Sequence, residues 1–267
     1  MSAQTSPWRL LLAGALAALC AAAFLPRAEA QQAGAAELAA AVNKAGRQRM
    51  LTQRIVKLYC QIGMDVATAS ARAQLAESVA LFERQLAELA PLARSAEARR
   101  AHEEAVRLWP PVKELATGPA GKDKALRLQA ASEALLAAAH RLTLELEAGA
   151  PLGTLVNLSG RQRMVSQRLA KLYMLRAWKI EVPGLAADME SAQAEFARGL
   201  GQLMRAGENT AEIDRELYAV AVQWEWFRSA LGYEGIASYS LVVADASENI
   251  LRSLERIVHL YEQAGSR

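Results

Sequence analysis

The chain has 267 residues, of which 52% are hydrophobic and 6% are aromatic, and its formal net charge is +3. A charge so close to neutral argues against nucleic acid as a partner. Cys60 is the only cysteine beyond the first 30 residues, so an intrachain disulfide there is excluded and stability must come from core packing.

Residues 1–30 have the pattern of a targeting segment. Arg9 precedes an apolar run over residues 10–25, and Ala28-Glu29-Ala30 has the small-x-small pattern of a cleavage site. We therefore expect a cleavable signal peptide and a periplasmic protein. The alternative is an uncleaved N-terminal membrane anchor, although the apolar run is short for a membrane span.

The rest of the chain reads as eight helices, because no strand-like alternation persists and glycine or proline marks each break. The first four are expected over residues 35–62, 67–89, 95–109 (interrupted by Pro110-Pro111 and ended by Gly118-Pro119) and 122–147. The second four are expected over residues 154–180, 185–206, 210–231 and 237–263. Four helices with short connections form an up-and-down bundle. The predicted order is a signal peptide (1–30), a four-helix bundle (31–148), a linker (149–153) and a second four-helix bundle (154–267).

The first helix of each predicted bundle carries the same motif. Residues 43–59 read NKAGRQRMLTQRIVKLY and residues 157–173 read NLSGRQRMVSQRLAKLY, with eleven of seventeen positions identical at a constant offset of 114. Such a match indicates an internal duplication.

On a helical wheel, one side of the first copy is apolar, with Leu51, Ile55 and Leu58 facing a core. The opposite side is a narrow stripe formed by Asn43, Arg47, Met50, Arg54 and Lys57. Gly46 lies at its edge, and a glycine inside a helix costs about 0.5–1 kcal/mol relative to alanine. Its presence in both copies indicates close approach of another backbone or a ligand. The other interpretation is a solvated basic face with an incidental glycine.

The pattern N-x-[AS]-G-R-Q-R-M-x-[ST]-Q-R-x-x-K resembles the signature of the PilJ-type sensor domain. That domain occurs at the periplasmic end of type IV pilus chemoreceptors and is related to the input domain of the NarX/NarQ nitrate-sensing kinases. The resemblance implies a chemotaxis-related sensor and a four-helix bundle whose first helix contributes an anion-binding Arg. The corresponding residues are Arg49 and Arg163, each three positions after a glycine. The chain departs from the nitrate kinases in its Arg-Gln after the glycine, its two copies in one chain, and the lack of a recognisable signalling module within its 267 residues.

The short linker constrains how the two bundles lie. About six residues span at most roughly 20 Å, so the second motif helix must begin near the start of the first. Side-by-side bundles would then form a fused homodimer with a pseudo-two-fold axis, at which Arg49 faces Arg163. The alternative is a tandem array in which each half dimerises with another chain.

Facing guanidinium groups repel each other, and a planar oxyanion between them would turn that repulsion into charge-assisted hydrogen bonds. The predicted ligand-binding residues are Asn43, Gly46, Arg47, Arg49 and Arg54 in the first copy and Asn157, Gly160, Arg161, Arg163 and Arg168 in the second. Nitrate, nitrite or a small carboxylate would fit. Carboxylates of the protein itself could instead neutralise the Arg residues.

Little else in the sequence carries chemistry. His102, His140 and His259 are isolated, so we expect surface or capping roles, and no nucleophile–base pair, metal motif or phosphate loop occurs. Trp109, Trp224, Trp226 and Phe227 are expected to be core or interface anchors, and Cys60 a small core residue. We therefore expect a protein without enzymatic activity and without a cofactor. The two hypotheses are a small-anion sensor or binding protein, acting with a membrane-bound sensor or another envelope protein, and a structural or interaction module.

Overall fold

The computed structural model describes residues 37–148, 153–233 and 237–264, and all regular structure in these ranges is helical. The predicted signal peptide and most of the predicted linker lie outside the described residues. An N-terminal helix is described over residues 37–63. The remaining elements of the first half are α2 (Thr68–Leu89), the 3-10 turn η1 (Ala90–Leu92), α3 (Ala96–Thr117) and α4 (Lys122–Glu147). Those of the second half are α5 (Gly153–Ala177), α6 (Leu185–Met204), α7 (Ala211–Leu231) and α8 (Ala237–Ala264). The all-α prediction is confirmed.

The third helix of each half begins at an N-cap residue whose side-chain oxygen accepts a backbone hydrogen bond. Ser95 accepts from the amide of Ala98 at 2.9 Å, and Thr210 accepts from the amide of Ile213 at 3.3 Å. Each cap satisfies an amide that the helix itself leaves without an acceptor. These caps begin α3 and α7 at equivalent places in the duplicated halves.

The predicted interruption at Pro110-Pro111 is wrong, because α3 continues through both prolines to Thr117. Proline removes a backbone donor and leaves a carbonyl one turn earlier without its partner. Both prolines lie on the exposed face of α3, and so do Val106 and Arg107 one turn earlier, whose carbonyls water can satisfy. The helix therefore continues through a Pro-Pro pair that would interrupt it if the pair were buried.

Each bundle has an aromatic pair at its centre. Trp109 stacks on Phe82 with ring centroids 4.2 Å apart, and Trp224 lies 4.4 Å from Phe196 in the second half. Phe227 and Cys60 are fully buried, as predicted. Trp226 is 75% exposed, so of the two roles expected for it, a core anchor or an interface anchor, the core role is excluded. The reason is helical phase, because two residues along a helix correspond to about 200° and turn Trp226 away from the core that holds Trp224.

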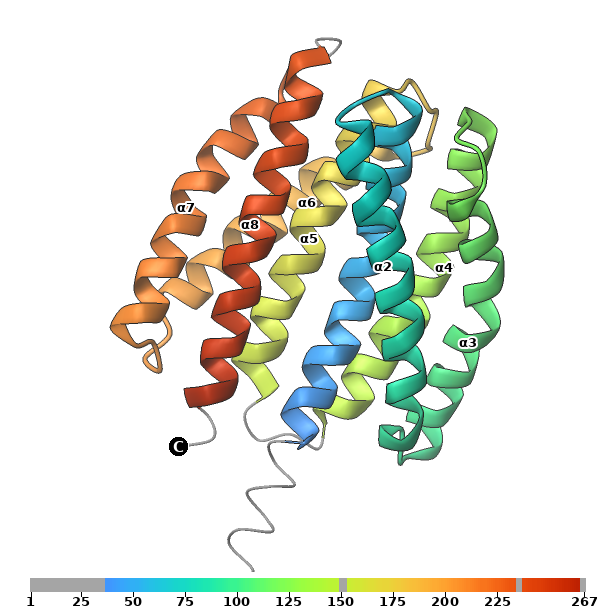
Figure 1. Ribbon diagram of the computed structural model, residues 1–267. Coiled ribbons are helices and arrows are strands. Elements are labelled where there is room, and N and C mark those ends of the chain that lie inside the picture. The colour runs from blue at the N-terminus through green and yellow to red at the C-terminus, as the bar shows by residue number, and fades with distance from the viewer. Residues whose placement is uncertain (1–36, 149–152, 234–236, 265–267) are drawn as a thin grey trace, which may run out of the picture.

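The two halves lie side by side, with the N-terminal helix and α5 running parallel at the centre (Figure 1). α3 and α7 lie at opposite outer edges of the molecule (Figure 1). Contacts between the halves are made within one chain, as the fused-dimer interpretation predicts. The alternative of a solvated basic face is wrong, since Met50, Arg49 and Lys57 are each no more than 1% exposed.

Two buried lysines join the halves through reciprocal ion pairs. Lys57 Nζ of the N-terminal helix lies 2.5 Å from Glu248 of α8, and Lys171 Nζ of α5 lies 2.5 Å from Glu133 of α4. Arg54 adds a bidentate contact to Glu248, at 2.7 and 3.1 Å. Burial alone would raise the pKa of the Glu248 carboxyl, but Lys57 and Arg54 outweigh it and lower the pKa to about 2. We call this set of pairs the lysine layer.

Glu248→Gln should destabilise the protein by about 3–5 kcal/mol, because it leaves Lys57 buried without its counter-charge. Urea unfolding at neutral pH measures the loss. Glu133→Gln is the matched control from the other half. Its effect should be smaller, since the Glu133 side chain is 34% exposed and has one cation partner where Glu248 has two. An equal or smaller loss for Glu248→Gln would contradict this account of the interface.

Candidate functional site

The side chains of the Arg-Gln-Arg segment in each motif point in different directions, because successive residues of a helix are about 100° apart. Gln48 Nε2 donates to the carbonyl oxygen of Phe82 on α2 at 3.4 Å. In the second copy Gln162 packs on α6 at Gly199, where an added Cβ would meet Gln162 Nε2 at 1.9 Å. The glutamines thus fix each motif helix within its own bundle. The following residue in each copy is an Arg that faces the other half.

Arg49 and Arg163 make reciprocal hydrogen bonds across the seam between the N-terminal helix and α5. Arg49 Nη2 donates to Asn157 Oδ1 at 2.7 Å, and Arg163 Nη2 donates to Asn43 Oδ1 at 2.6 Å. Both Arg side chains are buried, with exposures of 1% and 0%. Each motif therefore supplies the acceptor for the Arg of the other motif, which is the pattern of a two-fold pair.

Gly46 and Gly160 lie directly against these guanidinium groups. A Cβ added at Gly46 would lie 3.3 Å from Arg49 Nη2 and 3.9 Å from Arg163 Nη2, and at Gly160 the same two distances recur with the Arg residues exchanged. Both terminal nitrogens thus lie within 4 Å of the position that a side chain at either glycine would occupy. The glycines leave room for that convergence, which any side chain would narrow.

The guanidinium groups of Arg49 and Arg163 have more N–H donors than the surrounding residues supply acceptors for. Among the described residues neither has a carboxylate within ion-pair distance, and the Nε atoms of both and Nη1 of Arg163 have no hydrogen-bond partner. Burial, followed by the charge of Arg161, lowers the pKa of Arg49 to about 10. Burial, followed by the charge of Arg47, lowers the pKa of Arg163 to about 9. The arrangement is therefore a charged, donor-rich pair in a site that excludes water.

The other four predicted Arg residues are held by carboxylates. The pairs are Arg47 with Glu255, Arg161 with Glu195, Arg54 with Glu248 and Arg168 with Asp188. Arg47 and Arg161 flank the buried pair and lower the pKa values of Arg163 and Arg49 respectively. Arg54 belongs to the lysine layer and Arg168 contacts α6. The structure thus brings Asn43, Gly46, Arg49, Asn157, Gly160 and Arg163 together, but not Arg54 or Arg168.

Two residues of α4, which lie outside the motif, also contact the site. His140 Nδ1 lies 3.3 Å from Arg49 Nη1, so the neutral imidazole accepts a hydrogen bond there. Glu147 accepts from Asn157 Nδ2 at 2.6 Å, which turns Asn157 Oδ1 toward Arg49. The duplication contains a signal for Glu147 but not for His140. At an offset of 115, Glu147 matches Glu262, whereas His140 matches Glu255.

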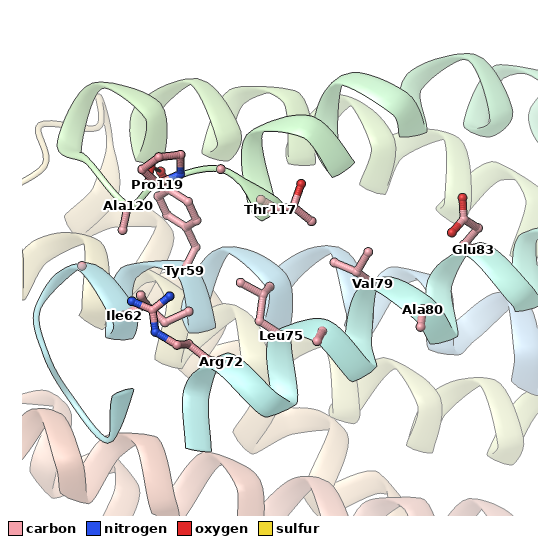
Figure 2. A pocket seen from close by; sticks show the side chains of 14 residues that line it. Tyr59, Ile62, Arg72, Leu75, Val79, Ala80, Glu83, Thr117, Pro119 and Ala120 are labelled. Atoms are coloured by element: carbon pink, nitrogen blue, oxygen red, sulfur yellow. Dashed lines mark hydrogen bonds between the residues drawn. The ribbon is translucent and has the colours of Figure 1, made fainter. Parts of the chain in front are cut away.

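A separate cleft of about 810 Å³ lies at the other end of the N-terminal helix. It opens between that helix, α2 and the turn after α3, and Tyr59, Leu75, Val79 and Pro119 are among its lining residues (Figure 2). At one end Glu83 forms an ion pair with Lys113 at 2.8 Å. The cleft contains none of the predicted ligand-binding residues.

Within the described ranges, no cluster of His, Cys, Asp and Glu side chains could hold a metal ion, and no helix is long and apolar enough to cross a membrane. A family model described as the N-terminal part of the type IV pili methyl-accepting chemotaxis transducer, PilJ, matches the chain twice, over residues 31–142 and 151–260. Searches of curated proteins and of solved structures give no match.

Arg163→Met should raise the free energy of unfolding by about 1–2 kcal/mol in buffer without oxyanions, because it replaces a buried, underpaired charge by an apolar side chain of similar volume. Chemical denaturation in a chloride buffer measures the change. Arg161→Met is the control, since Arg161 is exposed and paired with Glu195, and it should be neutral or slightly destabilising. A loss of stability in Arg163→Met larger than in the control would show that Arg163 stabilises the seam.

His140 should make the stability of the protein depend on pH. Burial, then Arg49 and Arg161, lower the pKa of its imidazole below the ordinary 6.5. The unfolded chain therefore binds a proton more readily than the folded protein, so this contribution is complete above pH 6.5 and is lost as the pH falls through the lowered pKa. His140→Gln should flatten the decline of unfolding free energy between about pH 7 and about pH 5.5, before most carboxylates titrate.

Urea unfolding at several pH values measures this slope, with His259→Gln as a control at an exposed site. An unchanged slope in His140→Gln would contradict the contact between a neutral His140 and Arg49.

Proposed function

Because the chain belongs to the PilJ family of type IV pilus chemotaxis transducer N-terminal domains, we propose that it is a non-catalytic periplasmic sensor that binds one small oxyanion between its halves. The site comprises Arg49 and Arg163 with Asn43 and Asn157, and the glycines make room for the ligand. Nitrate or nitrite is the preferred ligand, and a small carboxylate is the next.

One observation carries this proposal: two buried guanidinium groups converge, and their hydrogen-bond partners among the described residues are two amide oxygens and one imidazole. Two unit charges ~7 Å apart repel by about 2 kcal/mol at an effective dielectric constant of 20. An anion between them would reverse the sign of that interaction. It would also supply acceptors for donors that the protein leaves unused.

The asparagines suggest how a ligand enters. Each Oδ1 now occupies the position of an acceptor beside an Arg, where an anion oxygen would form a stronger, charge-assisted hydrogen bond. Rotation of the two amides would release the Arg residues and turn Nδ2 donors toward the ligand, and at Asn157 it would also break the hydrogen bond to Glu147. The exchange would break both Arg–Asn hydrogen bonds that cross the seam. Binding would therefore alter the contact between the N-terminal helix and α5.

The spacing at the glycines favours a small ligand. Each added Cβ would stand only 3.3 Å from a guanidinium nitrogen, so the space is narrow. A planar oxyanion can lie between guanidinium forks and accept from both. A larger dicarboxylate would have to push the two helices apart.

A sensor must report to another molecule, and the change would be transmitted through the motif helices. We propose a membrane-bound sensor or another envelope protein as the partner. The family supports this proposal, since PilJ domains are sensory parts of membrane chemoreceptors.

A second candidate function is a structural or protein-interaction module of the cell envelope. It is favoured by the ion pairs of Arg47, Arg54, Arg161 and Arg168, which form without any ligand. On this view Arg49 and Arg163 only hold the halves in register through the asparagines. The two candidate functions differ in whether the melting temperature of the protein depends on anions.

Nitrate or nitrite should raise the melting temperature of the protein in a thermal-shift assay, because a ligand that binds only the folded state stabilises it by mass action. Chloride and perchlorate at equal ionic strength separate specific binding from screening, and formate and acetate test small carboxylates. Arg49→Ala and Arg163→Ala should each abolish the shift. The control Arg161→Ala should retain it, because Arg161 is exposed and paired outside the seam.

An unchanged melting temperature across the whole anion panel in the wild-type protein would exclude the sensor proposal and leave the structural module. A shift that survives in both Arg49→Ala and Arg163→Ala would place the anion elsewhere.

A further inference from the structure

The outward face of α7 carries an apolar ridge that the core does not use. Tyr218, Val222 and Trp226 are 67%, 44% and 75% exposed. Their spacing of four residues places them on one side of the helix. α7 lies at an outer edge of the molecule (Figure 1), and the exposed fractions of these residues show that this side of the helix is open. We call these three residues the α7 ridge.

The duplication shows that the bundle does not require the ridge. Trp109 and Trp224 occupy the same place in the two halves, each packed on the Phe of the second helix of its bundle. Counted from these tryptophans, the counterparts of the ridge on α3 are Glu103, Arg107 and Pro111. The same fold thus has charged residues and a proline where the second half has two aromatic rings and a valine. A contiguous exposed apolar patch of this kind marks a contact surface.

The spacing along α7 is compatible with pairing to a second copy about a two-fold axis at Val222. In an antiparallel pair of α7 helices related by a two-fold axis at Val222, Tyr218 of each copy meets Trp226 of the other. Aromatic rings pack well in such pairs. Arg215 lies seven residues before Val222 and faces Ser229, seven residues after it, so Arg215 comes next to Glu225 of the other copy. An isologous interface requires this self-complementarity, whereas a different partner would not.

No like charges face each other in this pairing. Arg215 is exposed, and Glu225 is 63% exposed with only a neighbouring exposed partner, Arg228, on its own helix. Glu225 can therefore exchange a local pair for one across the axis. In the first half, Arg107 at the central position would face its own copy, so α3 could not pair in the same way.

We propose that the α7 ridge binds a second copy of this chain through an antiparallel α7–α7 contact centred on Val222. The contact does not depend on the proposed anion site, which lies between the N-terminal helix and α5. A single helix pair buries less than the roughly 800 Å² per partner of a standard interface. The dimer is therefore reversible and depends on protein concentration.

Sedimentation velocity over a concentration series tests the contact. Val222→Glu and Trp226→Ala should each raise the dimer dissociation constant about tenfold or more, since central apolar residues carry most of the binding energy of an interface. Arg107→Glu, at the counterpart position on α3, should leave it unchanged. Far-UV circular dichroism and the melting temperature of each exposed-site variant verify that folding is intact.

A charge reversal adds a test of the antiparallel register. Arg215→Glu alone and Glu225→Arg alone should each weaken the dimer severalfold, because like charges then meet across the axis. The double variant should restore the wild-type dissociation constant. Val222→Cys should form a disulfide-linked dimer on mild oxidation, while Leu126→Cys, at a similarly exposed position on α4, should not.

A monomer at every concentration, or a dimer that is unaffected by Val222→Glu, would overturn the proposal. Ridge-dependent binding to phospholipid vesicles by a chain that does not self-associate would also overturn it, because the ridge would then be a membrane-contact surface.

Discussion

The structure depends on the burial of cations along the seam between the N-terminal helix and α5. Arg49, Lys57, Arg163 and Lys171 are all almost inaccessible to water, and each is met by a residue from the opposite half. A buried charge that loses its partner is far more costly than one exposed to water. Separating the halves would break these contacts and would also expose to water the residues of the hydrophobic cluster that both halves share. The pairing of the bundles is therefore part of the fold itself.

Two layers of this seam differ in the chemistry of the partner. In the lysine layer the partners are carboxylates, so each buried lysine has a counter-charge within the protein and no ligand is needed. In the layer formed by Arg49 and Arg163, the partners from the opposite half are Asn157 and Asn43. Their amides accept hydrogen bonds but supply no negative charge. A carboxylate in place of either asparagine would close the site permanently. The amides hold the Arg residues in position while leaving the positive charge uncompensated, which is the condition that an anion can relieve.

Much of this arrangement could be predicted from the sequence because it repeats. The identical positions of the two motifs predicted the paired halves and the meeting of Arg49 with Arg163, and glycine and proline placed most helix ends within a few residues. His140 could not be found in this way, since it lies 91 residues from the Arg49 side chain that it contacts and its counterpart in the other half is Glu255. The prolines of α3 were misread because their effect depends on exposure, which spacing alone does not give. The binding role of the Arg pair stays a prediction.

Fusion of the two copies also permits a difference between them that a homodimer cannot have. On the Arg49 side His140 accepts a hydrogen bond, whereas the equivalent position on the other side is Glu255, which pairs with Arg47. One end of the site thus presents an imidazole to its Arg, and the other has a carboxylate that is paired with Arg47. A ligand in this site would experience two unlike ends although the backbone around it is nearly symmetric. The same freedom accounts for the α7 ridge, because once the inner faces were committed to each other, the outer faces of α3 and α7 were free to diverge.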